Sequence, residues 1–146
     1  MDVKEIISLM ESPSKEEIDL VTKAYNFASE AHKDHKRYSG EPYFVHLFET
    51  GKNLARLGMD ASTISAGLLH DVVEDAHASS QEVELAFGKE ILFMIEGVTK
   101  LGKLKYHGAE RHTESLRKLF VATSQDIRVL IIKLVERVHR LQTASH

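Results

Sequence analysis

Apolar residues recur at helical spacing along most of this chain, and only two prolines and eight glycines interrupt the pattern. One helical stripe follows Ser14 and Glu17, which are spaced as a capping box at a helix start. The last apolar segment is ambiguous, because the run Val129–Ile132 alone is typical of a strand. Apolar residues continue at helical spacing to Leu141, so we predict a helix there. The whole pattern predicts an all-α fold, a helical bundle of about six to eight helices.

Residues that cap or break helices divide the chain into predicted elements. A polar loop is predicted at 34–42, and a Lys-rich loop is predicted at 102–108. The first predicted helix follows Ser14, and the second covers 43–57 and is ended by Gly58. The third is capped by Asp60 or Ser62 and carries His70 to Asp75, and the fourth runs from Ser79 or Ser80 to Gly88. Three further helices are predicted at 91–98, 111–123 and 127–141. No repeat, linker or low-complexity stretch separates these elements, so residues 1–146 are predicted to form one domain.

The composition argues against several classes of protein. The formal net charge is -3, aromatic residues make up 7% of the chain and Trp is absent, which is not typical of a nucleic-acid-binding protein. No apolar stretch approaches the length of about 18 residues that spans a membrane, and the N-terminus is too acidic for a signal peptide. The chain has no cysteine, so disulfides and thiolate metal sites are excluded. We therefore expect a cytoplasmic protein with no membrane partner and no direct nucleic-acid partner.

The segment 68–75 (LLHDVVED) places one imidazole and three carboxylates inside an apolar run. Ionised carboxylates in apolar surroundings need compensation, which a divalent metal ion commonly supplies. On a helix, His70, Asp71, Glu74 and Asp75 would share one side, and Gly67 one turn earlier would leave space for an ion or a substrate. The same spacing is typical of an amphipathic helix with a solvated acidic face, so both interpretations stay open at this point.

Two residues outside this segment extend it to a candidate metal site. His46 lies on the preceding predicted helix, and antiparallel packing of the two helices would bring the imidazoles together. A carboxylate from the last helix completes the candidate ligands, which are His46, His70, Asp71 and Glu136. Such a set suits Zn²⁺, Mn²⁺ or Fe²⁺ and leaves room for a water whose pKa the ion lowers, which favours hydrolysis of a phosphate ester. Glu74 and Asp75 would orient or deprotonate that water, or protonate the leaving group.

Several strings of the chain match a known family in order and spacing. They are RYSGEPYFVH (37–46), LLHDVVED (68–75), FGKEI (87–91), GVTKLGKLK (97–105), RKLF (117–120), DIRVLIIKL (126–134) and ERVHRLQT (136–143). With these strings the chain resembles the metal-dependent HD phosphohydrolases and, within them, the (p)ppGpp hydrolase domain of the RelA/SpoT-type alarmone enzymes. The resemblance covers nearly the whole chain and is far more specific than the His-Asp doublet alone.

The resemblance implies a function in alarmone turnover during the stringent response. It implies an all-helical HD domain that removes the 3′-pyrophosphate from guanosine 3′,5′-bis(diphosphate), ppGpp, typically with Mn²⁺. By position, His46, His70 and Asp71 match metal ligands, and Glu74 and Asp75 match the acidic pair that activates water. In the family, one loop contacts the guanosine nucleotide, and Arg37 matches the residue whose guanidinium stacks on the guanine. Tyr38 and Ser39 occupy the rest of that loop. Thr143 matches a residue that contacts the nucleoside.

The last motif departs from the family pattern of Asp, Arg, apolar residue, His and Asn. Glu136 stands at the fourth ligand position, where its longer side chain could still bind the ion or could displace it. Arg140 stands where an Asn usually contacts substrate, and it could crowd the nucleoside or reach a phosphate instead. Lys133 and Arg137 lie beside Glu136, which favours internal salt bridges. His139 is expected to be structural, and most of the nine histidines are expected at the surface.

These departures keep three functional interpretations open. The first is the Mn²⁺-dependent ppGpp hydrolase, and the second is a catalytically impaired regulatory or nucleotide-binding module with the same fold. The third is an HD phosphohydrolase that acts on another nucleotide. The chain stops soon after the last motif, whereas the family's hydrolase domains continue through further helices. We therefore expect a domain that is truncated at its C-terminus, with a synthetase domain in a longer parent protein and a homodimer as further candidate partners.

Overall fold

The computed structural model describes residues 1–102, 117 and 126–143. These residues form the helices α1 (Val3–Ile7), α2 (Lys15–Ala31), α3 (Tyr43–Arg56), α4 (Ala61–Leu69), α5 (Ser80–Phe87), α6 (Lys89–Gly102) and α8 (Ile127–Thr143). In this described part the only β-structure is an isolated bridge between Lys36 and Pro42. The prediction of an all-α fold is therefore confirmed, while the predicted helix 111–123 and most of the Lys-rich loop lie outside the described residues.

Several helices start at capping residues that the sequence contains. The Ser14 hydroxyl accepts from the Glu17 N–H at 3.1 Å, which confirms the predicted capping box of α2. Asp60, and not Ser62, caps α4 by accepting from the Thr63 N–H at 3.0 Å. Helix α1 was not predicted, although Asp2 and Glu5 form the same kind of capping box at its start.

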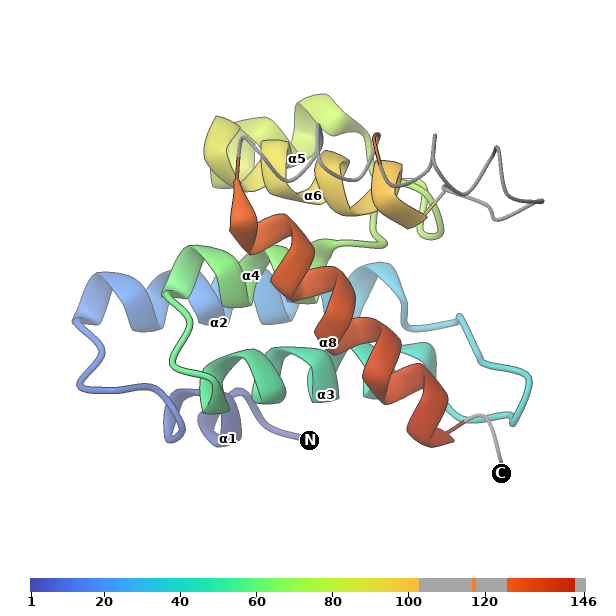
Figure 1. Cartoon of the computed structure of the whole chain (residues 1–146), viewed down its shortest axis with the longest axis horizontal. Coiled ribbons are helices and arrows are strands. Elements are labelled where there is room, and N and C mark those ends of the chain that lie inside the picture. The colour runs from blue at the N-terminus through green and yellow to red at the C-terminus, as the bar shows by residue number, and fades with distance from the viewer. Residues whose placement is uncertain (103–116, 118–125, 144–146) are drawn as a thin grey trace.

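Helix α4 is the centre of the bundle. It contacts α2, α3, α6 and α8, and all of its residues except Ser62 are buried. A helix that packs on every side needs no polar face, so its sequence, ASTISAGLL, is apolar or small all round. In Figure 1, α2, α4 and α3 lie roughly parallel, α5 and α6 lie above them, and α8 crosses in front of α4 and α3.

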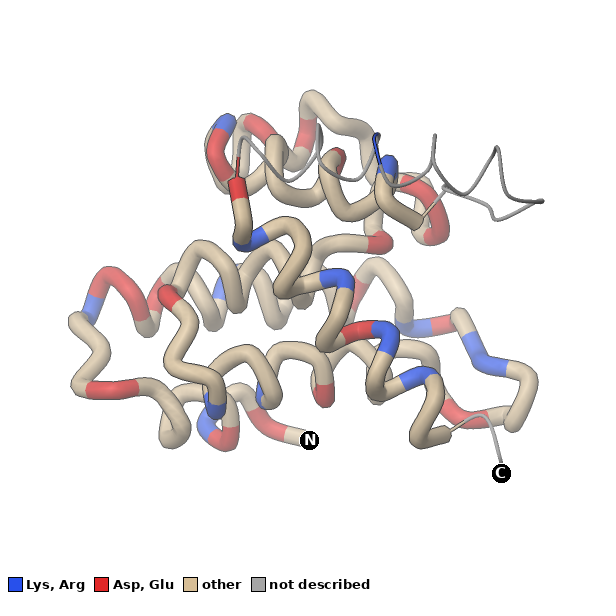
Figure 2. Tube along the Cα trace, in the orientation of Figure 1, with Lys and Arg blue, Asp and Glu red and all other residues tan. Residues whose placement is uncertain are grey.

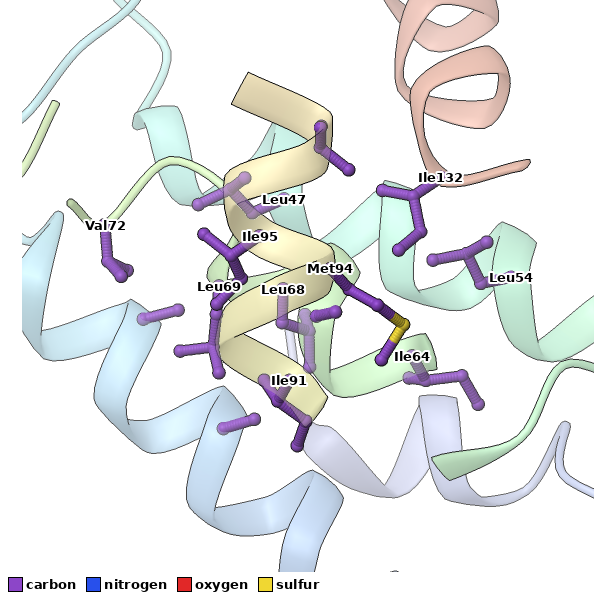
Figure 3. Packing of buried hydrophobic residues seen from close by; sticks show 14 of the residues in the cluster. Leu47, Leu54, Ile64, Leu68, Leu69, Val72, Ile91, Met94, Ile95 and Ile132 are labelled. Carbon is purple, nitrogen blue, oxygen red and sulfur yellow. The ribbon is translucent and has the colours of Figure 1, made fainter. Parts of the chain in front are cut away.

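The hydrophobic core joins α3, α4, α6 and α8. Leu68 and Leu69 of α4 meet Met94 and Ile95 of α6, with Ile132 of α8 at the side of the same cluster (Figure 3). Each of these side chains is almost fully excluded from solvent, and such burial contributes about 1.5–3 kcal/mol per large apolar side chain. This core holds α3, α4 and α8 in a fixed relation, and the candidate site residues come from α3, the end of α4 and the middle of α8.

Gly67 lets α4 approach α3 closely. A Cβ atom at position 67 would lie 2.4 Å from Leu54 Cδ1 and 3.6 Å from Thr50 Cγ2. The expectation that Gly67 leaves space for an ion or a substrate is therefore wrong, because the Leu54 side chain fills that space. The glycine is needed for helix packing, not for ligand access.

Helix α8 turns a short inner face toward the rest of the bundle. Val129, Ile132, Glu136 and His139 are its buried residues. Arg128 anchors the start of this helix through ion pairs with Asp126, Asp60 and Glu90, with N···O distances of 2.7, 3.2 and 2.9 Å. The spacing of the inner face places a carboxylate and an imidazole over α3 and α4. None of the described helices has the length and hydropathy to cross a membrane.

Candidate metal centre

His46 enters the site from the inner face of α3. Its side chain is buried, and Nδ1 lies 2.7 Å from Nδ1 of His139 on α8. In such a pair one nitrogen donates and the other accepts. Burial lowers the pKa of His46, so the neutral imidazole is its form near neutral pH. Its Nε2 lies 3.4 Å from Glu136 Oε1 but has no hydrogen-bond partner among the described residues.

His70 follows the last residue of α4. Helix α4 ends at Leu69, and residues 70–75 form successive turns, so the prediction of a helix through His70 to Asp75 is wrong. The His70 Nδ1 lies 2.6 Å from the carbonyl oxygen of Gly67. A carbonyl oxygen only accepts, so Nδ1 carries the proton and the Nε2 of the neutral ring carries a lone pair. That Nε2 is buried and has no hydrogen-bond partner in the described part of the chain.

Asp71 lies beside His70 at the edge of the site. One carboxylate oxygen, Oδ2, lies 3.2 Å from His70 Nε2 and accepts a short hydrogen bond from the Tyr43 hydroxyl. Burial opposes ionisation, but the His70 ring and the Tyr43 hydroxyl outweigh it and hold the pKa of Asp71 well below its usual range. Burial would also lower the pKa of His70, yet the Asp71 carboxylate and the Gly67 carbonyl raise it above its usual value. A bound cation at His70 Nε2 would therefore take the place of a proton.

Glu136 is the buried carboxylate of α8. Its Oε1 accepts from Arg140 Nε, and its Oε2 lies 3.1 Å from Lys133 Nζ. Burial would raise the pKa of Glu136, but the His46 ring and the two neighbouring cations hold it far below its usual range. The internal salt bridge predicted for Lys133 is present, and Arg140 adds a second one.

The donor atoms of His46, His70 and Glu136 lie within 4.8 Å of one another. Both imidazoles are buried, each presents an unpartnered Nε2, and the carboxylate is ionised. Unpartnered buried nitrogens are costly, and a divalent ion would satisfy both of them together with the carboxylate. These three residues therefore fit a metal ion. Asp71 is not a member of this close group but adjoins it through His70.

The acidic pair Glu74 and Asp75 lies at the mouth of the site. Both residues are exposed, and both line a pocket of about 220 Å³ together with His70, Asp71 and Glu136. Burial and then the neighbouring Asp71 raise the pKa of Asp75 above its usual value. A carboxyl group whose pKa is raised is better suited to accept and return a proton near neutral pH.

The residues predicted to contact substrate are split between two places. The Arg37 Nη2 donates to the Thr143 hydroxyl at 3.0 Å, so the polar loop and the end of α8 meet. Tyr38 and Ser39 are exposed on that loop. Of the five predicted substrate contacts, all within the described residues, only Arg140 lines the pocket of the acidic pair.

Three residues of the site were not predicted as such. Tyr43 links Asp71 to Arg140, because its oxygen also accepts from Arg140 Nη2 at 3.1 Å. His139 contacts His46, and the Gly67 carbonyl orients His70. Spacing was the available signal: Tyr43 lies three residues before His46, and His139 lies three residues after Glu136, on the same helix faces. We expected most histidines to lie at the surface. For the six histidines that the structure describes this expectation is wrong, because four of them, His32, His46, His70 and His139, are buried.

Comparison with known proteins assigns the sequence to a family. The model of the HD domain family matches residues 24–146. The chain belongs to the HD domain family. This HD domain is 39% identical over 134 residues to a GTP pyrophosphokinase of Myxococcus xanthus, covering 89% of this chain and 18% of that protein. It is 43% identical over 123 residues to a guanosine-3′,5′-bis(diphosphate) 3′-pyrophosphohydrolase of Aquifex aeolicus, covering 84% of this chain and 17% of that protein.

A solved structure shares the fold of this HD domain. It is a metazoan orthologue of SpoT, described as hydrolysing ppGpp with a role in starvation responses. The two structures have a TM-score of 0.64 and 24% sequence identity, and the match covers 90% of this chain and 71% of that one. The HD domain thus spans about a sixth of the length of its curated relatives and most of this structural relative.

Proposed function

We propose that this HD domain is a metal-dependent hydrolase that removes the 3′-pyrophosphate of ppGpp. The observation that carries the proposal is the convergence of His46, His70 and Glu136, with two unpartnered imidazole nitrogens, beside an acidic pair. The relative from Aquifex aeolicus bears the name of that activity, and the metazoan orthologue of SpoT is described as hydrolysing ppGpp. The substrate class is therefore a guanosine nucleotide with a 3′-diphosphate.

The residues of the site would have different roles in the proposed reaction. His46, His70, Asp71 and Glu136 would hold Mn²⁺, with Zn²⁺ or Fe²⁺ as alternatives that the same ligands accept. When bound, such an ion supplies a water of lowered pKa and positive charge beside the phosphoryl oxygens. Asp75, whose pKa is raised, would accept the proton of the attacking water and later return one to the leaving group. Glu74, exposed beside it in the same pocket, would orient the water.

The nucleoside would be held at some distance from the reacting phosphorus. Arg37, with its guanidinium fixed by Thr143, would stack on the guanine, and Tyr38 and Ser39 would complete that loop. Arg140 faces the pocket from α8 and would contact the phosphate side of the substrate. Because the relatives are far longer than this chain, the proposal includes a synthetase domain in a longer parent protein. A homodimer is a further candidate assembly that the length of the relatives does not address.

An assay of pyrophosphate release tests the proposal directly. The purified domain is incubated with ppGpp and Mn²⁺, and the expected products are GDP and pyrophosphate. His70→Ala should abolish release, whereas the exposed His77, in the same segment, provides a matched control as His77→Asn. Release that persists in His70→Ala would contradict the proposed centre, and a panel of nucleoside phosphates would identify a different substrate.

A second function is favoured by the ion pairs on Glu136. Arg140 and Lys133 already neutralise this carboxylate, so the same fold would also serve as a nucleotide-binding module without hydrolysis. In that case ppGpp binds and remains intact in the presence of Mn²⁺. The double change Glu136→Asp and Arg140→Asn should then produce pyrophosphate release from ppGpp.

A further inference from the structure

Both carboxylate oxygens of Glu136 are paired with cationic side chains of the same helix, α8. Arg140 Nε donates to Oε1, and Lys133 Nζ lies 3.1 Å from Oε2. Oε1 is also the oxygen that lies 3.4 Å from His46 Nε2. An ion held by the two imidazoles would therefore bind the oxygen that Arg140 already uses.

Arg140 is linked to the second carboxylate of the site as well. Its Nη2 donates to the Tyr43 oxygen at 3.1 Å, and the Tyr43 hydroxyl donates to Asp71. The guanidinium thus bridges α8 and the turn after α4, where a metal ion would do the same. Its side chain remains 44% exposed, so it has room to move away from Glu136.

The pocket beside this guanidinium has a nearly balanced charge. Four carboxylates and three cationic side chains line it, which leaves one net negative charge. A divalent ion bound to His46 and His70 would reverse the sign of that net charge. It would also repel the guanidinium and the ammonium group, which would lose much of their attraction to Glu136.

We propose that Arg140 competes with the divalent ion for Glu136, and that binding of the ion releases Arg140 and Lys133 to form an anion-binding pair in the pocket. The ligand of this pair is a phosphoryl-type dianion. The proposal rests on the metal centre of the proposed function but not on hydrolysis. In this proposal, bound metal ion raises the affinity for the anion, and bound anion raises the affinity for the metal ion. By thermodynamic linkage the two affinities rise by the same factor.

The first experiment compares Mn²⁺ affinity by calorimetry in the wild type, Arg140→Gln and Arg137→Gln. Arg137 lines the same pocket and carries the same charge, so Arg137→Gln reports the general effect of removing a cation. We expect Arg140→Gln to bind Mn²⁺ about tenfold more tightly than Arg137→Gln, because only Arg140 donates to Glu136 Oε1. Equal affinities of the two variants would overturn the competition while leaving the metal centre intact.

The second experiment uses sulfate as the probe, because it is a dianion of phosphate shape that binds Mn²⁺ weakly in solution. Sulfate should bind the wild type at least tenfold more tightly with Mn²⁺ present than without it. In Arg140→Gln, Mn²⁺ should raise the affinity for sulfate much less than in the wild type. Only the direct contact between sulfate and the bound ion would then remain to link the two binding events. An unchanged gain in Arg140→Gln would overturn the anion-binding role of Arg140.

The two experiments separate this proposal from the proposed function. If neither the wild type nor Arg140→Gln binds Mn²⁺, the metal centre itself is wrong and both proposals fail. If Arg140→Gln binds Mn²⁺ and the wild type does not, the competition is strong and the proposal is supported.

Discussion

The two imidazoles of the candidate centre are oriented by different partners. The Gly67 carbonyl dictates the tautomer of His70, whereas another imidazole, His139, meets the Nδ1 of His46. For His46 to present a lone pair at Nε2, its Nδ1 must carry the proton and His139 must accept it. The sequence shows the histidines but not these tautomers, because the partner atoms come from a distant helix and from a backbone carbonyl.

His139 is expected to set the metal affinity of His46. Changing His139→Leu removes the acceptor for the His46 Nδ1 proton, so Mn²⁺ affinity should fall about 10- to 100-fold, as for other partners of metal-bound histidines. His139→Asn keeps an oxygen acceptor near the position of Nδ1 and should lose less affinity. Calorimetric titration with Mn²⁺ measures both, and equal losses in the two variants would show that His139 acts only by packing.

His32 is expected to make stability depend on pH in the metal-free protein. Burial lowers its pKa from the ordinary value of about 6.5 to about 4, so between pH 6.5 and pH 4 the unfolded chain binds a proton at His32 and the folded chain does not. Folding stability should therefore decrease as pH falls from 6.5 to 4, by up to about 3 kcal/mol from this residue. Urea unfolding in EDTA should show a smaller pH dependence for His32→Asn. The control His77→Asn, at an exposed histidine, should retain the slope of the wild type.

At the scale of elements, the caps were predictable and the end of α4 was not. Ser14, Asp60 and Ser79 signal helix starts through short-range bonds that the sequence contains. The helical spacing of 68–75 predicted a continuous helix, but the chain forms turns after Leu69, where the His70 ring bonds the Gly67 carbonyl and the Val72 N–H bonds the Leu69 carbonyl. Periodicity reports which residues share a face and does not show where such local bonds replace the helical ones.

The close approach of α3 and α4 predicts a specific pair of substitutions. Gly67→Ala would place a methyl group against the fully buried Leu54, so it should destabilise the domain by about 1–3 kcal/mol. Leu54→Val removes the carbon that collides, and its own cost should be about 1 kcal/mol. The double variant should be more stable than the sum of the two costs predicts, as measured by urea unfolding. Strict additivity would show that the two positions are not in contact.

At the scale of the whole molecule, the candidate site is assembled from three distant parts of the chain. The fold class followed from the spacing of apolar residues, and the candidate metal ligands were proposed from residue types and family resemblance. The contact of Arg37 with Thr143 and the ion pair of Arg140 with Glu136 could not be predicted, because they depend on how α8 crosses α3 and α4. Figure 2 shows that Lys and Arg recur along α8, but only packing determines which of them turn toward the site.

Metal binding should stabilise the whole bundle. His46, His70 and Glu136 come from α3, the end of α4 and α8, so an ion that joins them binds the folded state alone. At a Mn²⁺ concentration about 100 times the dissociation constant, the gain should be roughly 2.7 kcal/mol, visible as a higher Tm. EDTA should reverse the rise in Tm, and His70→Ala should show no rise. A rise that survives in His70→Ala would place the ion elsewhere.

The hydrogen bond between Arg37 and Thr143 joins residues that are 106 positions apart. Helix α8, which contributes both Thr143 and Glu136, is synthesised after the helices α3 and α4. A nascent chain that has already folded its first helices would therefore hold two imidazoles and no acidic partner from α8. Any chemistry of this site must wait until α8 has been translated and has packed against α3 and α4.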